Sequence, residues 1–303
     1  MRRLLALVCA VFLALAAAPR AQAEGLEVNA KSAVLMDVAT GTVLYEKNAH
    51  EALAPASVTK VMTLLLTMEA IDSGTIAYDD VVTVSAYAAG MGGSQVFLAE
   101  GEQMSVDDLL KAVCVSSGND AAVALAEHVA GVTELFVEQM NNRAKGLGMD
   151  DTHFVNCTGL TAKGHVTSAY DIALMSRELL TRHPDIRRFT TIWTDTIRGG
   201  AFGLANTNKL IRFYDGATGL KTGYTSSAGY CISASALREE LHLSSVVLGS
   251  ARKEDRSRDV CTLLNWGFAN YAAVRFTADQ PLMPIPVSLG TREQAGCVLA
   301  EAQ

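Results

Sequence analysis

The sequence predicts an α+β fold in which strands from both ends of the chain form one antiparallel sheet around a helical insert. The patterns run in the order strands, helices, strands, helix, and such segregation is typical of α+β folds. A helix that begins near residue 57 is apolar on nearly every side, as expected of a buried helix. The chain has 303 residues, half of them apolar, which is enough for one large core.

The expected strands come in two pairs. Residues 32–38 and 42–46 flank the turn Ala39-Thr40-Gly41 and predict a hairpin. Residues 228–236 and 241–249 predict two further strands, and an amphipathic helix at 253–271 closes this part. The helices of the insert are expected at residues 107–115, 121–130, 133–145 and 168–182. Residues 149–166 are expected to form a loop.

The N-terminus has the pattern of a secretory signal peptide. Arg2 and Arg3 precede a charge-free run from Leu4 to Ala18, and Ala21-Gln22-Ala23 follows. A basic segment, an apolar segment and an Ala-x-Ala site predict cleavage after Ala23, so residues 1–23 would be removed and the protein exported to the outer face of the cell envelope or secreted. The alternative is an uncleaved anchor, but fifteen apolar residues are short for a span of ~20.

Charge and cysteine content exclude several functions. Without the three arginines of the signal peptide, 22 basic and 32 acidic residues remain, and a net charge of −10 argues against nucleic-acid binding. Five cysteines would remain; without Cys-x-x-Cys spacing they fit buried small apolar residues, and a disulfide stays open. Metal ligation is not expected, because His153, Cys157 and His165 are loosely spaced and no second ligand pair follows.

Ser57 and Lys60 form the first candidate site. Residues three apart lie on one helical face, so the two side chains can touch. Lys60 would sit at the positive end of a helix among apolar residues, and both features disfavour its charged form. An uncharged lysine could take the proton of Ser57, and a base that works near neutrality needs a pKa of roughly 7–8. Alternatively, Lys60 could lay its stem on the helix while its amine reaches water.

Two further motifs follow in order, Ser117-Gly118-Asn119 between two helices and Lys221-Thr222-Gly223 at the start of a strand-rich stretch. Each is weak by itself, because a capping asparagine or a solvated lysine explains it. Together with Ser57-x-x-Lys60 they are the motifs of the penicillin-interacting serine acyl-transferases, which include class A β-lactamases and penicillin-binding proteins.

The sequence from about Ser32 to Tyr271 resembles the bacterial D-alanyl-D-alanine carboxypeptidases, the low-molecular-mass penicillin-binding proteins. Besides the three motifs, the resemblance rests on residues 54–60, 91–94, 136–149, 152–160 and 219–230. It implies a β-lactamase/transpeptidase-like α/β sandwich, with a five-stranded antiparallel sheet, flanking helices and an all-helical insert. The catalytic domain would span residues 24–277, and residues 278–303 would be a linker and the truncated start of a small C-terminal β domain.

The resemblance assigns catalytic roles to three residues. Ser57 would be the nucleophile that attacks the carbonyl between two D-alanines. Lys60 would accept its proton. Ser117 would relay a proton between Lys60 or Lys221 and the leaving amine. No cofactor is implied.

Substrate binding is implied for the remaining motif residues. Asn119 would hold Lys60 and the substrate amide. Lys221 would help to keep Lys60 neutral and would attract the terminal carboxylate, to which Thr222 would offer its hydroxyl. Gly223 would let the strand approach the ligand, and the backbone N–H groups of Ser57 and Tyr224 would form the oxyanion hole.

The implied function is removal of the terminal D-alanine from peptidoglycan stem peptides that end in D-Ala-D-Ala, with β-lactam antibiotics as covalent inhibitors. Glu138 and Asn142 have a spacing that a deacylating glutamate could use, but a solvated helix face explains them, so slow release of penicillin is expected. A β-lactamase or esterase on the same scaffold, or a non-catalytic penicillin-binding sensor, are the alternatives. The family's anchor helix is not complete here, so membrane association stays open.

Overall fold

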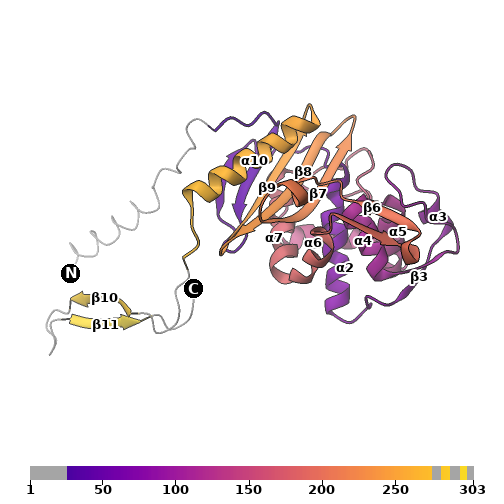
Figure 1. Cartoon of the computed structure of the whole chain (residues 1–303), viewed down its shortest axis with the longest axis horizontal. Helices are drawn as coiled ribbons and strands as arrows, with labels where there is room; N and C mark the ends of the chain where they lie inside the picture. Colours follow the sequence, from indigo (N-terminus) through magenta and orange to yellow (C-terminus); the bar gives the residue numbers. More distant parts are fainter. Residues whose placement is uncertain (1–25, 275–280, 287–293, 299–303) are drawn as a thin grey trace.

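The computed structural model describes residues 26–274, 281–286 and 294–298 of the chain. Its main sheet is five-stranded, in the order β2-β1-β9-β8-β7, and every neighbouring pair is antiparallel. The strands are β1 (Ser32–Asp37), β2 (Val43–Lys47), β7 (Ala217–Thr225), β8 (Gly229–Arg238) and β9 (Leu241–Ser250). The sheet therefore joins both ends of the folded region, and the predicted α+β fold is confirmed (Figure 1).

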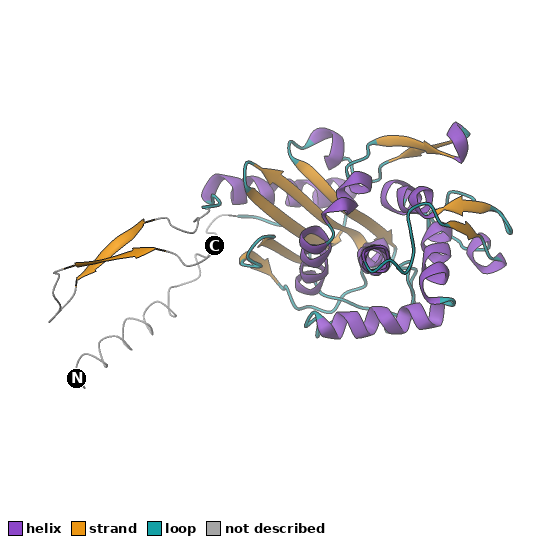
Figure 2. Cartoon of the chain, turned by 90° about the horizontal axis from the view of Figure 1, so that it is seen from below, coloured by secondary structure: helices purple, strands orange, loops and turns teal. Residues whose placement is uncertain are grey.

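The main sheet is buried on both faces because its strands alternate between two cores. Ala33 and Leu35 of β1 face the core beneath α10 (Lys253–Asn270), whereas Val34 and Met36 face the larger core of the insert. This two-residue period follows from the pleat of a strand. Helix α7 (Ala169–Arg182) packs against β1 and β9 on the insert side. The strands thus lie between helices (Figure 2).

The helical insert surrounds α2 (Lys60–Asp72), of which nearly every residue is buried. Apolar residues on all sides predicted this position, and α2 ends before Ser73 and Gly74 as expected. The other helices outside the sheet layer are α3 (Ala86–Ala89), α4 (Val106–Ser116), α5 (Asn119–Ala130), α6 (Thr133–Gly146), α8 (Arg187–Thr190) and α9 (Leu210–Phe213), with the short 3-10 helices η1 (Ala56–Thr59), η2 (Pro184–Ile186) and η3 (Arg198–Gly200).

Three two-stranded sheets complete the described fold: β3 (Val81–Thr83) with β4 (Gln103–Ser105), β5 (Thr194–Ile197) with β6 (Phe202–Ala205), and β10 (Pro281–Pro286) with β11 (Gln294–Val298). The hairpin of β5 and β6 was not predicted, because its strands have only four residues each and are joined through a pair of glycines. The expected signal peptide lies outside the described residues. Within the described residues, no helix combines the length and apolarity that a membrane crossing requires.

Candidate active site

Ser57 lies in the tight turn η1 rather than in the α-helix that the sequence predicted, and α2 begins only at Lys60. The turn is unusual because Ala56 has φ = 49°, a left-handed conformation that most residues avoid. Gly159 makes room for it: a Cβ on this glycine would lie 1.9 Å from the carbonyl oxygen of Ala56. The backbone beside Ser57 is therefore shaped by close packing of a distant loop.

Lys60 is fully buried and its amine is held in three directions. Its Nζ donates to Asn119 Oδ1 at 2.6 Å, to the carbonyl oxygen of Thr158 at 2.7 Å and to Ser57 Oγ at 3.2 Å. Burial, and then the positive charge of Lys221, hold the pKa of Lys60 well below its ordinary value. Among the described residues, no carboxylate pairs with this amine. The alternative in which the amine reaches water is wrong, because none of Lys60 is exposed.

The carbonyl of Thr158 belongs to the long loop between α6 and α7, and sequence reasoning missed it. Asn156 shapes this part of the loop: its Oδ1 accepts from the N–H groups of Thr158 and Gly159 at 3.2 and 2.7 Å, and its Nδ2 donates to the carbonyl of Leu160 at 2.9 Å. The length of the predicted loop 149–166 could have indicated a functional role, because loops longer than about 12–15 residues usually have a function.

Ser117 and Asn119 come from the break between α4 and α5. Ser117 ends α4 in the left-handed conformation, with φ = 64°, and α5 begins at Asn119. Asn119 donates through Nδ2 to the carbonyl of Gly92 at 2.6 Å, while its Oδ1 accepts from Lys60. The hydroxyl of Ser117 is buried without a hydrogen-bond partner among the described residues. The expected contact of this hydroxyl with Lys60 or Lys221 is therefore not made in this structure.

Lys221 and Thr222 lie in the interior of β7, which begins at Ala217. Lys221 is 1% exposed, and its Nζ donates to the carbonyl oxygen of Thr222 at 3.0 Å. Burial is the main cause that lowers the pKa of Lys221 from 10.5 to about 7. The hydroxyl of Thr222 donates to Thr207 Oγ1 at 2.8 Å, a partner that the sequence did not indicate.

Gly223 brings β7 against the turn that carries Ser57. A Cβ at Gly223 would lie 2.9 Å from the backbone nitrogen of Ser57 and 3.0 Å from Ala56 Cβ. Only a glycine permits this approach without movement of the backbone. The next residue, Tyr224, is 55% exposed, and its ring lies 4.4 Å from that of Tyr230. The Lys221-Thr222-Gly223 motif therefore contacts the turn that carries Ser57 through backbone atoms.

Arg256 of α10 is a further buried cation that sequence reasoning missed. It is 4% exposed, and its Nε has no hydrogen-bond partner among the described residues. Its positive charge contributes, after burial, to the low pKa of Lys221. In the described part of the chain, no group of three or more His, Cys, Asp or Glu side chains is placed to hold a metal ion. Cys114, Cys157, Cys231 and Cys261 are free thiols.

The fold is that of the penicillin-binding proteins. Penicillin-binding protein 5 from Haemophilus influenzae matches it with a TM-score of 0.81 and 33% sequence identity, over 91% of this chain and 81% of that one. Penicillin-binding protein D2 from Listeria monocytogenes, in its ampicillin-bound form, matches with a TM-score of 0.70 and 35% identity, over 80% of this chain and 99% of that one.

Sequence comparison identifies one family within the penicillin-binding proteins. Residues 17–252 match the D-alanyl-D-alanine carboxypeptidase family, and the chain belongs to that family. The D-alanyl-D-alanine carboxypeptidase DacF of Bacillus subtilis strain 168 is 49% identical over 245 residues, which cover 80% of this chain and 63% of that protein. The chain thus spans less than two thirds of the length of this relative.

Proposed function

We propose that the protein is a serine D-alanyl-D-alanine carboxypeptidase, which removes the terminal D-alanine from peptidoglycan stem pentapeptides through an acyl-enzyme on Ser57. One observation carries the proposal: a buried amine with a depressed pKa lies 3.2 Å from the hydroxyl of Ser57. Family membership supports the choice of substrate. A serine needs such an adjacent base because its hydroxyl is a weak nucleophile at neutral pH.

The contacts of Lys60 direct its lone pair. A neutral amine has two N–H donors, and the oxygens of Asn119 and Thr158 at 2.6 and 2.7 Å accept them. The lone pair then faces Ser57 Oγ, whose O–H donates to it. As Oγ bonds to the carbonyl carbon of the penultimate D-alanine, the proton passes to Lys60, and the bond to the leaving nitrogen breaks once that nitrogen has received a proton. Ser117, whose buried hydroxyl has no hydrogen-bond partner among the described residues, is the proposed relay for this second transfer.

The substrate would lie along β7. The N–H groups of Ser57 and Tyr224 are the proposed oxyanion donors, because Gly223 seats the strand directly against the amide of Ser57. Such donors contribute about 3–4 kcal/mol to stabilising the transition state. Lys221 in its charged form would attract the terminal carboxylate. Thr222 would have to turn its hydroxyl from Thr207 to reach that carboxylate.

We infer that β-lactams acylate Ser57 and are released slowly. The ampicillin-bound state of the related Listeria protein supports acylation. Slow release is supported by the positions of two carboxylates: Glu138 is exposed on α6, and Asp120 is buried and accepts from the backbone N–H groups of Val96 and Leu98. Neither carboxylate is placed to activate a water molecule beside Ser57.

Export and domain division are part of the same proposal. Residues 1–23 would direct export, residues 24–277 would form the catalytic domain at the outer face of the cell envelope, and residues 278–303 would begin a small β domain. Export is consistent with the substrate, because peptidoglycan lies outside the cytoplasmic membrane.

The decisive assay measures release of D-alanine from diacetyl-L-Lys-D-Ala-D-Ala. The wild type should release D-alanine, and Ser57→Ala should abolish release. Ser73→Ala, at the exposed end of α2, is the matched control and should behave as the wild type. No release by the wild type, or equal release by Ser57→Ala, would refute the proposal. With a chromogenic cephalosporin, a burst followed by a stall is expected, and sustained fast turnover would favour a β-lactamase instead.

A further inference from the structure

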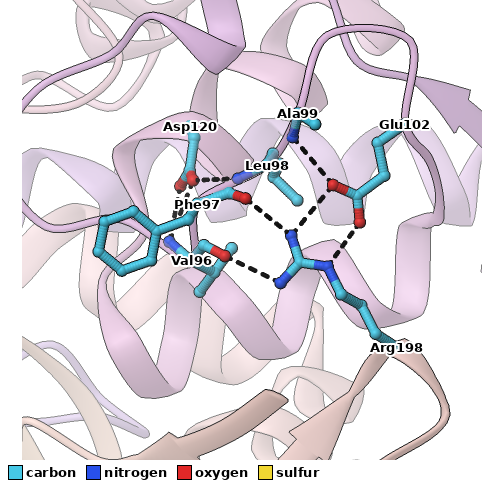
Figure 3. Close-up of polar contacts among 7 residues, drawn as sticks. All are labelled: Val96, Phe97, Leu98, Ala99, Glu102, Asp120 and Arg198. Carbon is cyan, nitrogen blue, oxygen red and sulfur yellow. Dashed lines mark hydrogen bonds and ion pairs between the residues drawn. The ribbon is translucent and has the colours of Figure 1, made fainter. Parts of the chain in front are cut away.

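The backbone of residues 96–99 is held by three side chains from elsewhere in the chain (Figure 3). Asp120 Oδ2 accepts from the N–H groups of Val96 and Leu98, both at 3.0 Å. From the opposite side, the guanidinium of Arg198 donates to the carbonyl oxygens of Val96 and Phe97 at 2.9 and 3.0 Å. In the described part of the chain this segment pairs with no strand, so these bonds replace the ladder that would otherwise fix it.

Glu102 joins Arg198 to the same segment. Its Oε1 accepts from Arg198 Nε at 2.6 Å and its Oε2 from Arg198 Nη2 at 3.0 Å, a bidentate pair, and Oε2 also accepts from the N–H of Ala99 at 2.9 Å. Bidentate arginine–carboxylate pairs fix orientation as well as distance. Together these contacts hold Phe97 at φ = 58°, a conformation that is costly for a bulky residue. We call Asp120, Arg198 and Glu102 the loop clamp.

The other end of the clamped loop touches Asn119. The carbonyl of Ser94 accepts from the backbone N–H of Asn119 at 2.7 Å, and the carbonyl of Gly92 accepts from its side-chain Nδ2 at 2.6 Å. The packing at Gly93 is tight, since a Cβ there would lie 2.7 Å from Asn119 Nδ2. The position of this loop therefore decides what the side chain of Asn119 meets.

The carbonyl of Gly92 fixes which way the amide of Asn119 points. Because a carbonyl oxygen can only accept, it selects Nδ2 as its partner and leaves Oδ1 toward Lys60. If the loop moved away, the amide could rotate and present its N–H₂ group to the amine. Lys60 would then lose its 2.6 Å acceptor, and its lone pair would no longer be directed at Ser57.

We propose that Asp120 and Arg198 are positioning residues for acylation, acting through the loop of residues 92–99 on the amide of Asn119; this inference rests on the proposed function of Ser57 and Lys60. Arg198 lies at the turn of the β5–β6 hairpin, and its guanidinium carbon lies 5.2 Å from the centre of the Phe202 ring. The hairpin that sequence reasoning missed thus becomes part of the support of the active site.

The test compares Arg198→Gln with a matched control, Arg143→Gln. Arg143 also makes two carboxylate bonds, to Glu69 at 2.7 Å and Glu178 at 2.6 Å, and it is 28% exposed against 23% for Arg198. It does not contact the clamped loop. Acylation of Ser57 by a fluorescent penicillin should slow about 10-fold or more in Arg198→Gln, while both variants lose similar thermal stability. The acid limb of the acylation rate against pH should move to lower pH in Arg198→Gln only.

A double-mutant cycle shows whether Arg198 acts through Asn119. In an Asn119→Ala background, Arg198→Gln should slow acylation no further, because the amide that it orients is gone. Additive losses would overturn the positioning role, as would an Arg198→Gln variant slowed no more than Arg143→Gln. In either case an acylated wild type would leave the proposed function intact. A wild type that penicillin does not acylate would overturn the proposed function and this inference together.

Discussion

Replacement of Lys221 by methionine should make the folded protein more stable while it removes the cation proposed to bind the substrate carboxylate. Lys221 is 1% exposed, and within the described residues its amine donates a single hydrogen bond, to the carbonyl of Thr222. Methionine has a similar length, no charge and a flexible apolar chain that fills such a space. The site thus keeps a residue that opposes folding.

The size of this effect follows from the pKa of Lys221, which folding lowers from 10.5 to about 7. Because the folded state releases the proton first, the unfolded state binds more protons between these values, and stability rises with pH across this window. Well below pH 7 the cost of the lysine is fully present and amounts to about 5 kcal/mol, and at pH 7, where about half of the folded molecules carry the proton, it is about 4 kcal/mol. Loss of the bond to Thr222 offsets about 1 kcal/mol, so the variant should gain about 3–4 kcal/mol.

Urea unfolding at pH 7 and pH 10 measures this difference. Lys221→Met should be the more stable protein at pH 7, and the gap should shrink to under about 1 kcal/mol at pH 10 as the wild type recovers its loss. Lys209→Met, at an exposed site, should show no such dependence on pH. A variant less stable than the wild type at pH 7, or a gap that does not change with pH, would show that the buried charge of Lys221 does not oppose folding.

Three further outcomes are expected. The value of kcat/KM for a peptide with a free terminal carboxylate should fall as pH rises through about 7, where Lys221 loses its charge. The same peptide ending in an amide should show no such fall. If the amide peptide shows the same fall, Lys221 does not contact the carboxylate. Arg256→Gln removes a positive charge that lowers the pKa of Lys221, so the limb should move to higher pH; a shift to lower pH contradicts the assignment. Gly223→Ala places a Cβ 2.9 Å from the nitrogen of Ser57 and should slow acylation about 100-fold with unchanged circular dichroism, whereas wild-type acylation would disprove the close approach.

Side-chain patterns made much of the fold predictable. β1 was visible as a short apolar run that ends at a turn, and such a run is typical of a strand buried on both faces. The buried α2 was visible because it is apolar all round. The depressed pKa of Lys60 could be expected from its neighbours, since burial disfavours a charged amine wherever the chain places it.

Contacts made by the backbone were not predictable. The carbonyls of Thr158 and Gly92 decide how Lys60 and Asn119 are held, yet a carbonyl leaves no mark on residue type. Ser57 was predicted to begin an α-helix, but it lies in a tight turn whose conformation at Ala56 depends on Gly159, a residue distant in the chain. Long-range packing, rather than local propensity, determines such positions.

The proposed mechanism requires that Lys60 carries no proton when Ser57 attacks, and NMR titration of its side chain measures that charge. With ¹³C-labelled lysine, the Cε signal of Lys60, assigned by its loss in Lys60→Arg, reports the charge of the amine. We expect the amine to lose its proton well below the pH range of an ordinary lysine side chain, because burial and the charge of Lys221 lower its pKa. An amine that stays protonated up to pH 10 would contradict this mechanism.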